Sequence, residues 1–200
     1  EVYEKGKRIK LYIAEVSTTT KGPRILVSRT HPGLLKRLFE LEVPEIFDGT
    51  VEIKAVAREA GYRSKMAVTS DEENVDPVGA CVGPKGMRVQ AVVDQLNGEK
   101  IDIIKWNNDP AELIANALNP AEVLKVITDD EAQEAKVIVP DFQLSLAIGK
   151  EGQNARLAAK LTGWKVDIKK ESEYVFDDEE SDSETEDIDE SEEIEESEED

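Results

Sequence analysis

Hydrophobic and polar positions alternate in two stretches near the start of the chain. Residues 7–16 alternate apolar and polar side chains, and a short apolar run over 24–28 follows a turn that contains Thr, Gly and Pro. This pattern predicts a β-hairpin. Because an isolated hairpin is marginally stable in water, we expect missing strands or a neighbouring domain beside it. The chain starts at Glu1 within a strand-like pattern, which indicates a fragment whose N-terminal part is missing.

Residues 31–106, here called the first unit, switch between helical and strand periodicity. Apolar side chains recur at helical spacing from Leu34 to Leu41, and the pattern ends before Pro44. The elements expected next are strands over 50–58 and 62–70, a short apolar helix over 78–82, a longer helix over 89–96 and a strand over 100–106. The segment Gly83-Pro84-Lys85-Gly86 separates the two later helices.

Residues 107–172, here called the second unit, repeat this order. Asp109 is expected to cap a helix that starts at Pro110. The elements expected next are strands over 122–128 and 135–139, a short helix over 142–148, the loop Gly149-Lys150-Glu151-Gly152, a helix ending near 161 and a strand over 164–169. The glycine loops are 66 residues apart and the following helices and strands 65, so one residue is expected to be lost just after the second loop. Such self-similarity indicates a duplicated domain.

Each unit carries the pattern Gly-x-x-Gly at the start of an amphipathic helix. Glycines let the backbone turn tightly and leave no side chain between it and a ligand. The following helix presents free N–H groups and a partial positive charge, where a phosphate can bind. Lys85 and Lys150 add one cation to each loop. The duplicated context favours phosphate binding over the alternative of two helical corners in which glycine serves packing alone.

The order helix–strand–strand–helix–GxxG–helix–strand resembles the type II KH domain, an RNA-binding module whose GxxG loop clamps a single-stranded backbone. Two such units after a hairpin resemble the NusA family of bacterial transcription termination/antitermination factors. Similar segments are Ser28-Arg29-Thr30-His31-Pro32, Val43-Pro44-Glu45-Ile46, Asp76-Pro77-Val78-Gly79-Ala80-Cys81-Val82-Gly83 and Asn107-Asn108-Asp109-Pro110. The resemblance covers about residues 1–172.

This resemblance implies an α+β fold in four parts. The parts are the truncated end of an S1-type OB barrel over 1–30, KH domains over 31–106 and 107–172, and a disordered acidic tail over 173–200. The implied function is that of a cytoplasmic, non-enzymatic elongation factor that binds nascent single-stranded RNA and modulates pausing, termination and antitermination. The implied partners are RNA, RNA polymerase (chiefly through an N-terminal domain expected to be missing here) and other antitermination factors. We expect a monomer that needs no cofactor and contacts no membrane.

RNA contact is expected at the two loops and just after them. The expected residues are Gly83, Pro84, Lys85, Gly86, Arg88, Gly149, Lys150, Glu151, Gly152 and Arg156. The bases are expected to lie on apolar residues such as Val82, Val89 and Ile148, although helical spacing explains Val89 equally well as core. Glu151 repels phosphate, so the second loop is expected to bind weakly or to serve geometry alone.

Composition changes this picture at one end of the chain. The formal net charge is −20, but residues 177–200 hold 17 of the 45 acidic residues and no basic one. The remaining 28 acids face 25 bases, so the body is nearly neutral. The acidic tail cannot bury enough surface to offset its chain entropy, which predicts disorder. It is expected either to solvate the protein or to mimic nucleic acid and dock on a basic face.

Two other classes of protein remain as alternatives. The first is an enzyme: polynucleotide phosphorylase also contains KH and S1-type modules, but in the opposite order. A GTPase with a KH domain is disfavoured because the sequence contains no GxxxxGK[ST] motif. A protein–protein scaffold is favoured by the near-neutral body, because nucleic-acid binders usually carry a basic excess. One cysteine and one histidine leave little material for a disulfide framework, a zinc site or a catalytic triad.

Several single residues have structural interpretations. Cys81 is expected to fill the core, and His31 to start a helix. The tryptophans at 106 and 164 are expected to lie in the core or between the units. Arg58, Arg63 and Lys65 flank a turn and are expected to form a solvated hairpin tip, with phosphate contact as the lesser alternative.

Overall fold

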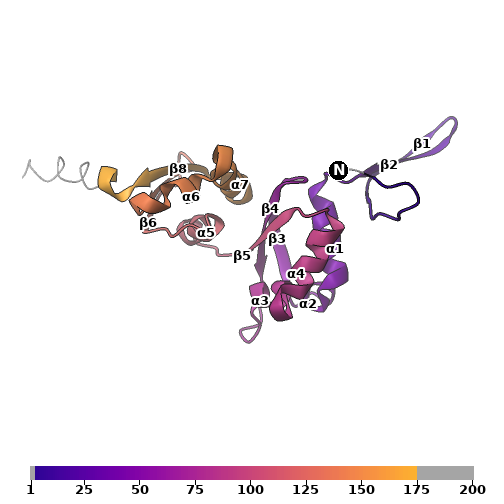
Figure 1. The fold of residues 1–200 in the computed structure, drawn as a ribbon, viewed down its shortest axis with the longest axis horizontal. Helices are drawn as coiled ribbons and strands as arrows, with labels where there is room; N and C mark the ends of the chain where they lie inside the picture. The colour runs from indigo at the N-terminus through magenta and orange to yellow at the C-terminus, as the bar shows by residue number, and fades with distance from the viewer. Residues whose placement is uncertain (1–2, 175–200) are drawn as a thin grey trace, which may run out of the picture.

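The computed structural model describes residues 3–174 and begins with the expected hairpin. Strand β1 (Tyr12–Thr19) pairs antiparallel with β2 (Gly22–Ser28), and no further strand in residues 3–174 joins them. Figure 1 shows the hairpin extending away from the remaining elements. Its apolar side chains are exposed, with Ile13 and Ile25 both 58% accessible. The hairpin is confirmed, and its origin in an S1-type barrel stays a prediction.

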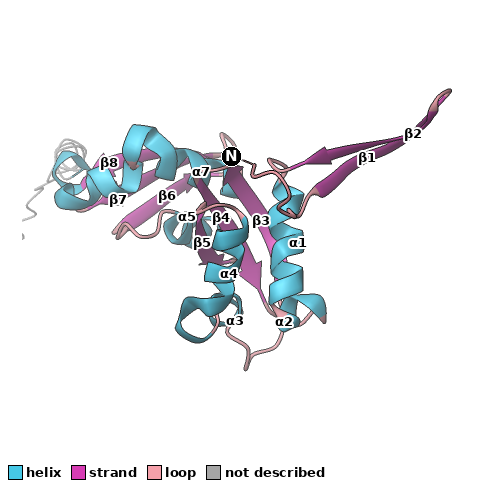
Figure 2. Cartoon of the chain, turned by 45° about the vertical axis from the view of Figure 1, so that its right-hand side comes forward, coloured by secondary structure: helices cyan, strands magenta, loops and turns pink. Residues whose placement is uncertain are grey.

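The first unit is a three-stranded sheet covered by helices. Its elements are α1 (Pro32–Glu42), α2 (Pro44–Phe47), β3 (Glu52–Glu59), β4 (Arg63–Thr69), α3 (Pro77–Val82), η1 (Pro84–Gly86), α4 (Met87–Gln95) and β5 (Lys100–Lys105). The strand order is β3-β4-β5, with β3 antiparallel and β5 parallel to β4. Helices α1 and α4 lie side by side on this sheet (Figure 2). Helix α1 starts as expected, because His31 Nδ1 accepts a 2.9 Å hydrogen bond from the Gly33 N–H.

The second unit repeats this topology. Its elements are α5 (Pro110–Ala117), β6 (Lys125–Asp129), β7 (Glu134–Val139), η2 (Asp141–Gln143), α6 (Leu144–Ile148), η3 (Lys150–Gly152), α7 (Gln153–Thr162) and β8 (Lys165–Lys170). Strand β7 lies between an antiparallel β6 and a parallel β8. Asp109 caps α5, as predicted, by accepting a 3.0 Å hydrogen bond from the Ala111 N–H. Strand β6 starts later than predicted, because Ala121 still turns back and bonds to the Leu118 carbonyl.

The units differ by one residue at the end of their last helix. Both α4 and α7 start directly after their glycine loops. Helix α7 ends at Gly163, which has a φ of 79°, whereas α4 is followed by both Asn97 and Gly98 at positive φ. The prediction that the length difference lies just after the second loop is therefore wrong. The additional residue of the first unit lies in the turn that leads to β5.

One hydrophobic cluster crosses the boundary between the units. Ala57, Ala67 and Ile104 of the first sheet belong to the same buried cluster as the inner faces of α5 and α7. Trp164 is buried in this cluster and Trp106 packs against it, as predicted for both tryptophans. A separate cluster fills the first unit beneath α1, α3 and α4. The units are therefore joined by apolar packing and not only by a linker.

Buried ion pairs support the turn between β3 and β4. The side chains of Arg58 and Glu99 are 1% and 0% exposed and meet through hydrogen bonds of 2.8 and 2.9 Å. Lys65 is also buried, and its Nζ bonds to Asp102 at 3.0 Å. Arg63 forms a bidentate pair with Asp102. The predicted solvated tip is therefore wrong for Arg58 and Lys65, because carboxylates just before β5 and on it bind them away from water, whereas Arg63 stays 24% exposed beside its partner.

Two further predictions concern single features of the chain. Cys81 is fully buried, and this burial raises the pKa of its thiol to about 12, which confirms its role as core filler. Among the helices of residues 3–174, none has the length and apolar character needed to cross a membrane. Residues 175–200 of the predicted acidic tail lie outside the described residues.

Candidate nucleic-acid interface

The two glycine loops have the same backbone geometry. The φ/ψ pairs of the first loop are 71°/175° at Gly83, 53°/27° at Lys85 and 74°/14° at Gly86. Residues 149–152 repeat these angles to within a few degrees. Positive φ favours glycine at the first and last positions, whereas the third position holds a side chain in the left-handed region. Each loop leads directly into the N-terminus of the following helix.

The first glycine of each loop has no space for a side chain. A Cβ on Gly83 would lie 2.6 Å from the Cγ of Arg88. A Cβ on Gly149 would lie 2.8 Å from the Cβ of Asn154 and 2.9 Å from its backbone nitrogen. Packing therefore requires glycine here in addition to the positive φ. The first glycine of each loop therefore has a packing role, as the alternative interpretation predicted. This packing involves the inner face of the loop and does not occupy its outer face.

Arg88 lies beneath the first loop and not on its outer edge. Its Nη1 donates to the Ala80 carbonyl at 2.6 Å and to the Glu45 carboxylate at 2.9 Å. At the corresponding position of the second unit, Asn154 donates to the Ala147 carbonyl at 3.0 Å. Both side chains tie the short helix before a loop to the helix after it. Asn154 is absent from the residues predicted above, although its spacing of five residues from Gly149 matches that of Arg88 from Gly83. RNA contact by Arg88 stays a prediction.

The outer edges of the loops carry different charges. Lys85 and Lys150 are exposed, and neither forms an ion pair within residues 3–174. Because the loops have the same backbone, Lys85 takes the place of Glu151, and Pro84 takes that of Lys150. The first loop therefore presents one cation, whereas the second presents a cation beside an anion. Pro84 also lacks the N–H donor that Lys150 offers.

Arg156 is bound across the boundary between the units. Its Nε donates to Glu59 at 2.6 Å, and Gln153 donates to the other carboxylate oxygen at 3.0 Å. The hydrogen bond from Arg156, and to a lesser extent that from Gln153, lowers the pKa of Glu59. The Arg156 side chain remains 47% exposed. Glu59 precedes Arg156 by 97 residues, and no local pattern could have identified it. RNA contact by Arg156 stays a prediction.

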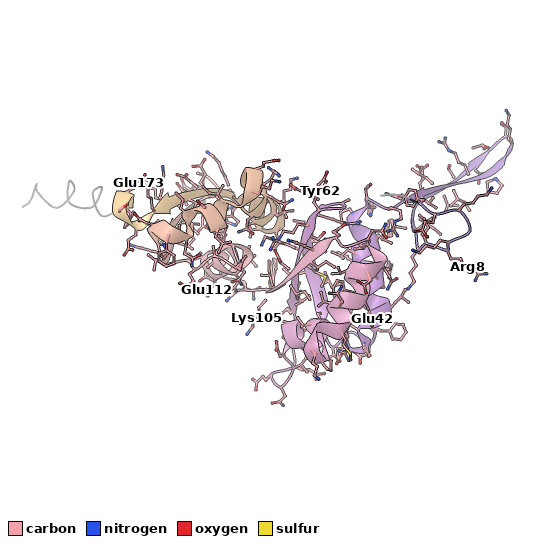
Figure 3. All side chains as sticks on the ribbon, viewed as in Figure 1. Arg8, Glu42, Tyr62, Lys105, Glu112 and Glu173 are labelled. Atoms are coloured by element: carbon pink, nitrogen blue, oxygen red, sulfur yellow. The ribbon has the colours of Figure 1, made fainter. Side chains whose placement is uncertain are left out.

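A groove of about 800 Å³ connects the second loop with the first unit. Gly149, Lys150 and Glu151 line one side, and Tyr62 and Lys100 line the other. Figure 3 shows Tyr62 at the edge of the first unit that faces the second. The first loop does not line this groove, so the structure does not bring the two loops together in one pocket.

The apolar residues expected beneath the bases occupy different environments. Ile148 is exposed, and Val82 is half-buried beside the first loop. Val89 is partly buried and packs against the core of the first unit, as its alternative interpretation predicted. Of these three residues, only Ile148 is exposed beside its loop.

A metal ion and a phosphate need different groups at the loops. No group of three or more His, Cys, Asp or Glu side chains within residues 3–174 could hold a metal ion. The two loops present glycine backbone, helix N-termini and exposed lysines, which together suit the phosphates of a single strand.

Comparisons with known proteins agree with this geometry. Residues 29–106 match the model of the NusA-like first KH domain, and residues 110–175 match that of the NusA-like second KH domain. The Bacillus subtilis protein named "Transcription termination/antitermination protein NusA" is 68% identical, over 86% of this chain and 47% of its own length. The Thermus thermophilus protein of the same name is 57% identical, over 83% of this chain and 43% of its own length. The Mycobacterium bovis protein of the same name is 59% identical over 84% of this chain and 49% of its own length.

The chain spans just under half the length of these relatives. A solved structure titled "Crystal structure of APE1850" matches with a TM-score of 0.50 at 21% identity, over 69% of this chain and 97% of that one, and it shares the fold. The parallel pairing of β4 with β5 and of β7 with β8 fits two KH domains of the predicted type II order. The two family models match consecutive ranges that together cover most of the chain. The chain therefore belongs to the NusA family and carries both of its KH domains.

Proposed function

We propose that this chain is the RNA-binding part of a transcription termination/antitermination factor and holds nascent single-stranded RNA on its two KH domains. One observation carries the proposal. Two loops with the same backbone geometry each present glycines, an exposed lysine and a helix N-terminus to solvent. The names of the relatives support the role in transcription.

The expected contacts divide into phosphate and base contacts. Phosphates bind the loops at Gly83–Gly86 and Gly149–Gly152, where the backbone can approach closely. Bases rest on apolar residues such as Val82 and Ile148. Arg88 and Arg156 contribute only after exchange of their present carboxylate partners, Glu45 for the former and Glu59 for the latter.

We also propose how the chain divides into domains and where in the cell the factor works. The matched ranges support KH domains over 31–106 and 107–172. The hairpin before them is proposed as the end of an S1-type barrel. RNA contact is assigned to these two domains, and polymerase contact to parts of the relatives beyond this chain. A factor that acts on nascent bacterial RNA works in the cytoplasm.

The test is single-stranded RNA binding by the full chain, measured by fluorescence anisotropy. The variant Lys85→Glu with Lys150→Glu reverses the charge of both loops. A matched control, Lys105→Glu with Lys136→Glu, makes the same charge change at two exposed strand positions outside the loops. We expect the loop variant to bind at least about tenfold more weakly than the control, because it loses phosphate contacts.

The salt dependence gives a second measurement on the same samples. Contact with phosphates makes log affinity fall with log salt by about 0.7 for each phosphate neutralised on a single strand. The loop variant should show a flatter slope than the control. Equal weakening of both variants, or a flat slope for the wild type, would favour the scaffold alternative instead.

A further inference from the structure

The groove between the units is a composite surface that neither KH domain forms alone. It has a volume of about 800 Å³, and its walls come from the second glycine loop and from the turn between β3 and β4. The units share an apolar cluster and the Glu59–Arg156 ion pair at this boundary. The walls of the groove are therefore fixed relative to each other by packing and by charge.

Tyr62 is the aromatic residue that lines this groove, and it is largely exposed. Its side chain is 74% accessible, although a tyrosine ring usually buries much of its surface. The turn that carries it is held firmly. Glu99 accepts hydrogen bonds from Arg58, from Ser64 Oγ at 2.6 Å and from the Gly61 N–H at 2.8 Å. An exposed ring on a fixed turn can stack on a planar ligand with little loss of backbone entropy.

The Tyr62 backbone is also bonded on both sides. Its N–H donates to the Glu59 carbonyl at 3.0 Å, and its carbonyl accepts from the Lys100 N–H at 3.1 Å. Lys100 thus starts β5 directly beside the turn. The first unit thus contributes an aromatic ring to the groove through Tyr62 and, through Lys100, a cation without an ion-pair partner among the described residues.

The charges of the groove suit a phosphate. Within residues 3–174, no ion pair is found for Lys100 or Lys150, whereas the Arg156 charge is neutralised by Glu59. Two unpaired cations therefore lie in the groove against one unpaired anion, Glu151. A phosphate would contact both lysines.

An unsatisfied polar atom lies in the same wall. Asn154 lines the groove and is 5% exposed. Its Nδ2 donates to two carbonyls, but its Oδ1 has no hydrogen-bond partner among the described residues. Buried polar atoms without partners are rare in folded proteins. The unpartnered oxygen is therefore a polar cost that the fold accepts next to the groove.

We propose that this groove binds one nucleotide of the single strand as the strand passes between the two KH domains. Its base stacks on Tyr62, and its phosphate lies between Lys100 and Lys150. The inference rests on the proposed RNA-binding function and adds to the second loop two contacts from the first unit, Tyr62 and Lys100, that belong to neither GxxG loop. The ring and the cations favour a nucleotide over an apolar peptide, which would leave both lysines unpaired.

The test compares three variants of the full chain in binding a 12-nucleotide single-stranded RNA. Tyr62→Ala removes the ring, and Tyr62→Phe keeps its stacking face. Phe47→Ala is the matched control, because Phe47 is 80% exposed on α2, outside the groove. Stacking of one base predicts a loss of roughly 5- to 100-fold for Tyr62→Ala. Tyr62→Phe and Phe47→Ala should stay within about twofold of the wild type.

A second measurement reads the contact directly. RNA that carries 5-iodouridine crosslinks to stacked aromatic side chains, and mass spectrometry locates the crosslink. We expect it at Tyr62. Wild-type binding with no loss in Tyr62→Ala and no crosslink at Tyr62 would overturn the subsite while the proposed function stands. Equal losses in Tyr62→Ala and Tyr62→Phe would overturn the stacking role. Absence of RNA binding by the wild type would overturn both proposals.

Discussion

The two units share a loop and a sheet topology, but they support their hairpin tips in different ways. In the first unit, Glu99 lies just before the last strand and binds the tip through buried hydrogen bonds. In the second unit, Trp164 occupies the same place and joins the apolar cluster. The tip of the second hairpin, residues 129–134, is exposed, and the side-chain bonds that hold it are exposed too: Asp129 accepts from two backbone N–H groups, Gln133 donates to the Asp130 carbonyl and Glu134 pairs with Lys165.

This difference shows that one backbone plan accepts either a buried charge or a buried ring at the same position. A buried ion pair adds little net stability over an apolar replacement, but it fixes geometry well when every partner is satisfied. The first tip meets the second unit through Glu59 and lines the groove with Tyr62, whereas the second tip meets no other unit. The fixed support lies where the structure needs a defined boundary.

The largest expected effect follows from removal of the buried carboxylate. Glu99→Ala leaves the Arg58 guanidinium buried without its partner, which should destabilise the chain by about 3–5 kcal/mol. Glu131→Ala at the exposed second tip is the control and should change stability by less than about 0.5 kcal/mol. Urea unfolding followed by circular dichroism measures both. Similar values for the two variants would contradict the comparison.

The same carboxylate should make stability depend on pH. Burial opposes ionisation of Glu99, but hydrogen bonds from Arg58, Ser64 and Gly61 outweigh it and lower its pKa. A lowered folded-state pKa contributes stability above the unfolded value of about 4.3, and that stability is lost as the pH falls through the folded value. Glu99→Gln should therefore show a shallower loss of the urea midpoint between about pH 5 and 3 than the wild type. Parallel curves would exclude this role for Glu99.

The next largest effect concerns the glycine that begins each loop. Gly149→Ala places a Cβ 2.9 Å from the backbone nitrogen of Asn154 at positive φ, so we expect a destabilisation of about 2–4 kcal/mol. Gly163→Ala has an equally positive φ but open space around it, and it should lose only about 1 kcal/mol. Gly83→Ala should fall between them, because Arg88 presents a flexible side chain. Thermal unfolding of the three variants ranks them, and equal losses would show that φ alone requires glycine.

A smaller effect separates the loops by charge. Glu151→Lys gives the second loop the side chain that Lys85 provides in the first, and RNA affinity should rise about three- to tenfold at low salt. The reverse change, Lys85→Glu, should lower the affinity by a similar or larger factor. Anisotropy at several salt concentrations measures both. An unchanged affinity for Glu151→Lys would mean that the second loop does not contact phosphate.

The smallest effect is expected at the ion pair between the units. Glu59→Gln keeps the shape of the side chain and removes its charge, so stability should fall by less than about 1 kcal/mol for this partly exposed pair. Arg156 would then be free for phosphate, and RNA affinity should rise by about twofold. Glu52→Gln, the same charge change at another ion-paired carboxylate of the same strand, serves as the control for salt effects. A lower RNA affinity of Glu59→Gln would show that Arg156 acts only when Glu59 positions it.

Local patterns predicted most of the fold. The helix starts at His31 and Asp109, the succession of helices and strands along each unit and both glycine loops followed from capping, periodicity and repetition. The hairpin-tip prediction was wrong for Arg58 and Lys65, yet residues 129–134 of the second unit show the same kind of turn exposed. The local pattern of a charged turn is the same whether or not a distant carboxylate lies beneath it.

The sequence by itself determined the elements, the duplication and the loop geometry, because these depend on residues within a few positions of each other. Tertiary structure alone decided that Arg58 meets Glu99 across 41 residues and that Arg156 meets Glu59 across 97. It also decided that Tyr62 and Lys150 line one groove. The physical reason is that burial and pairing of a charge depend on what the folded chain brings into contact with it, and periodicity along the chain carries no information about that contact.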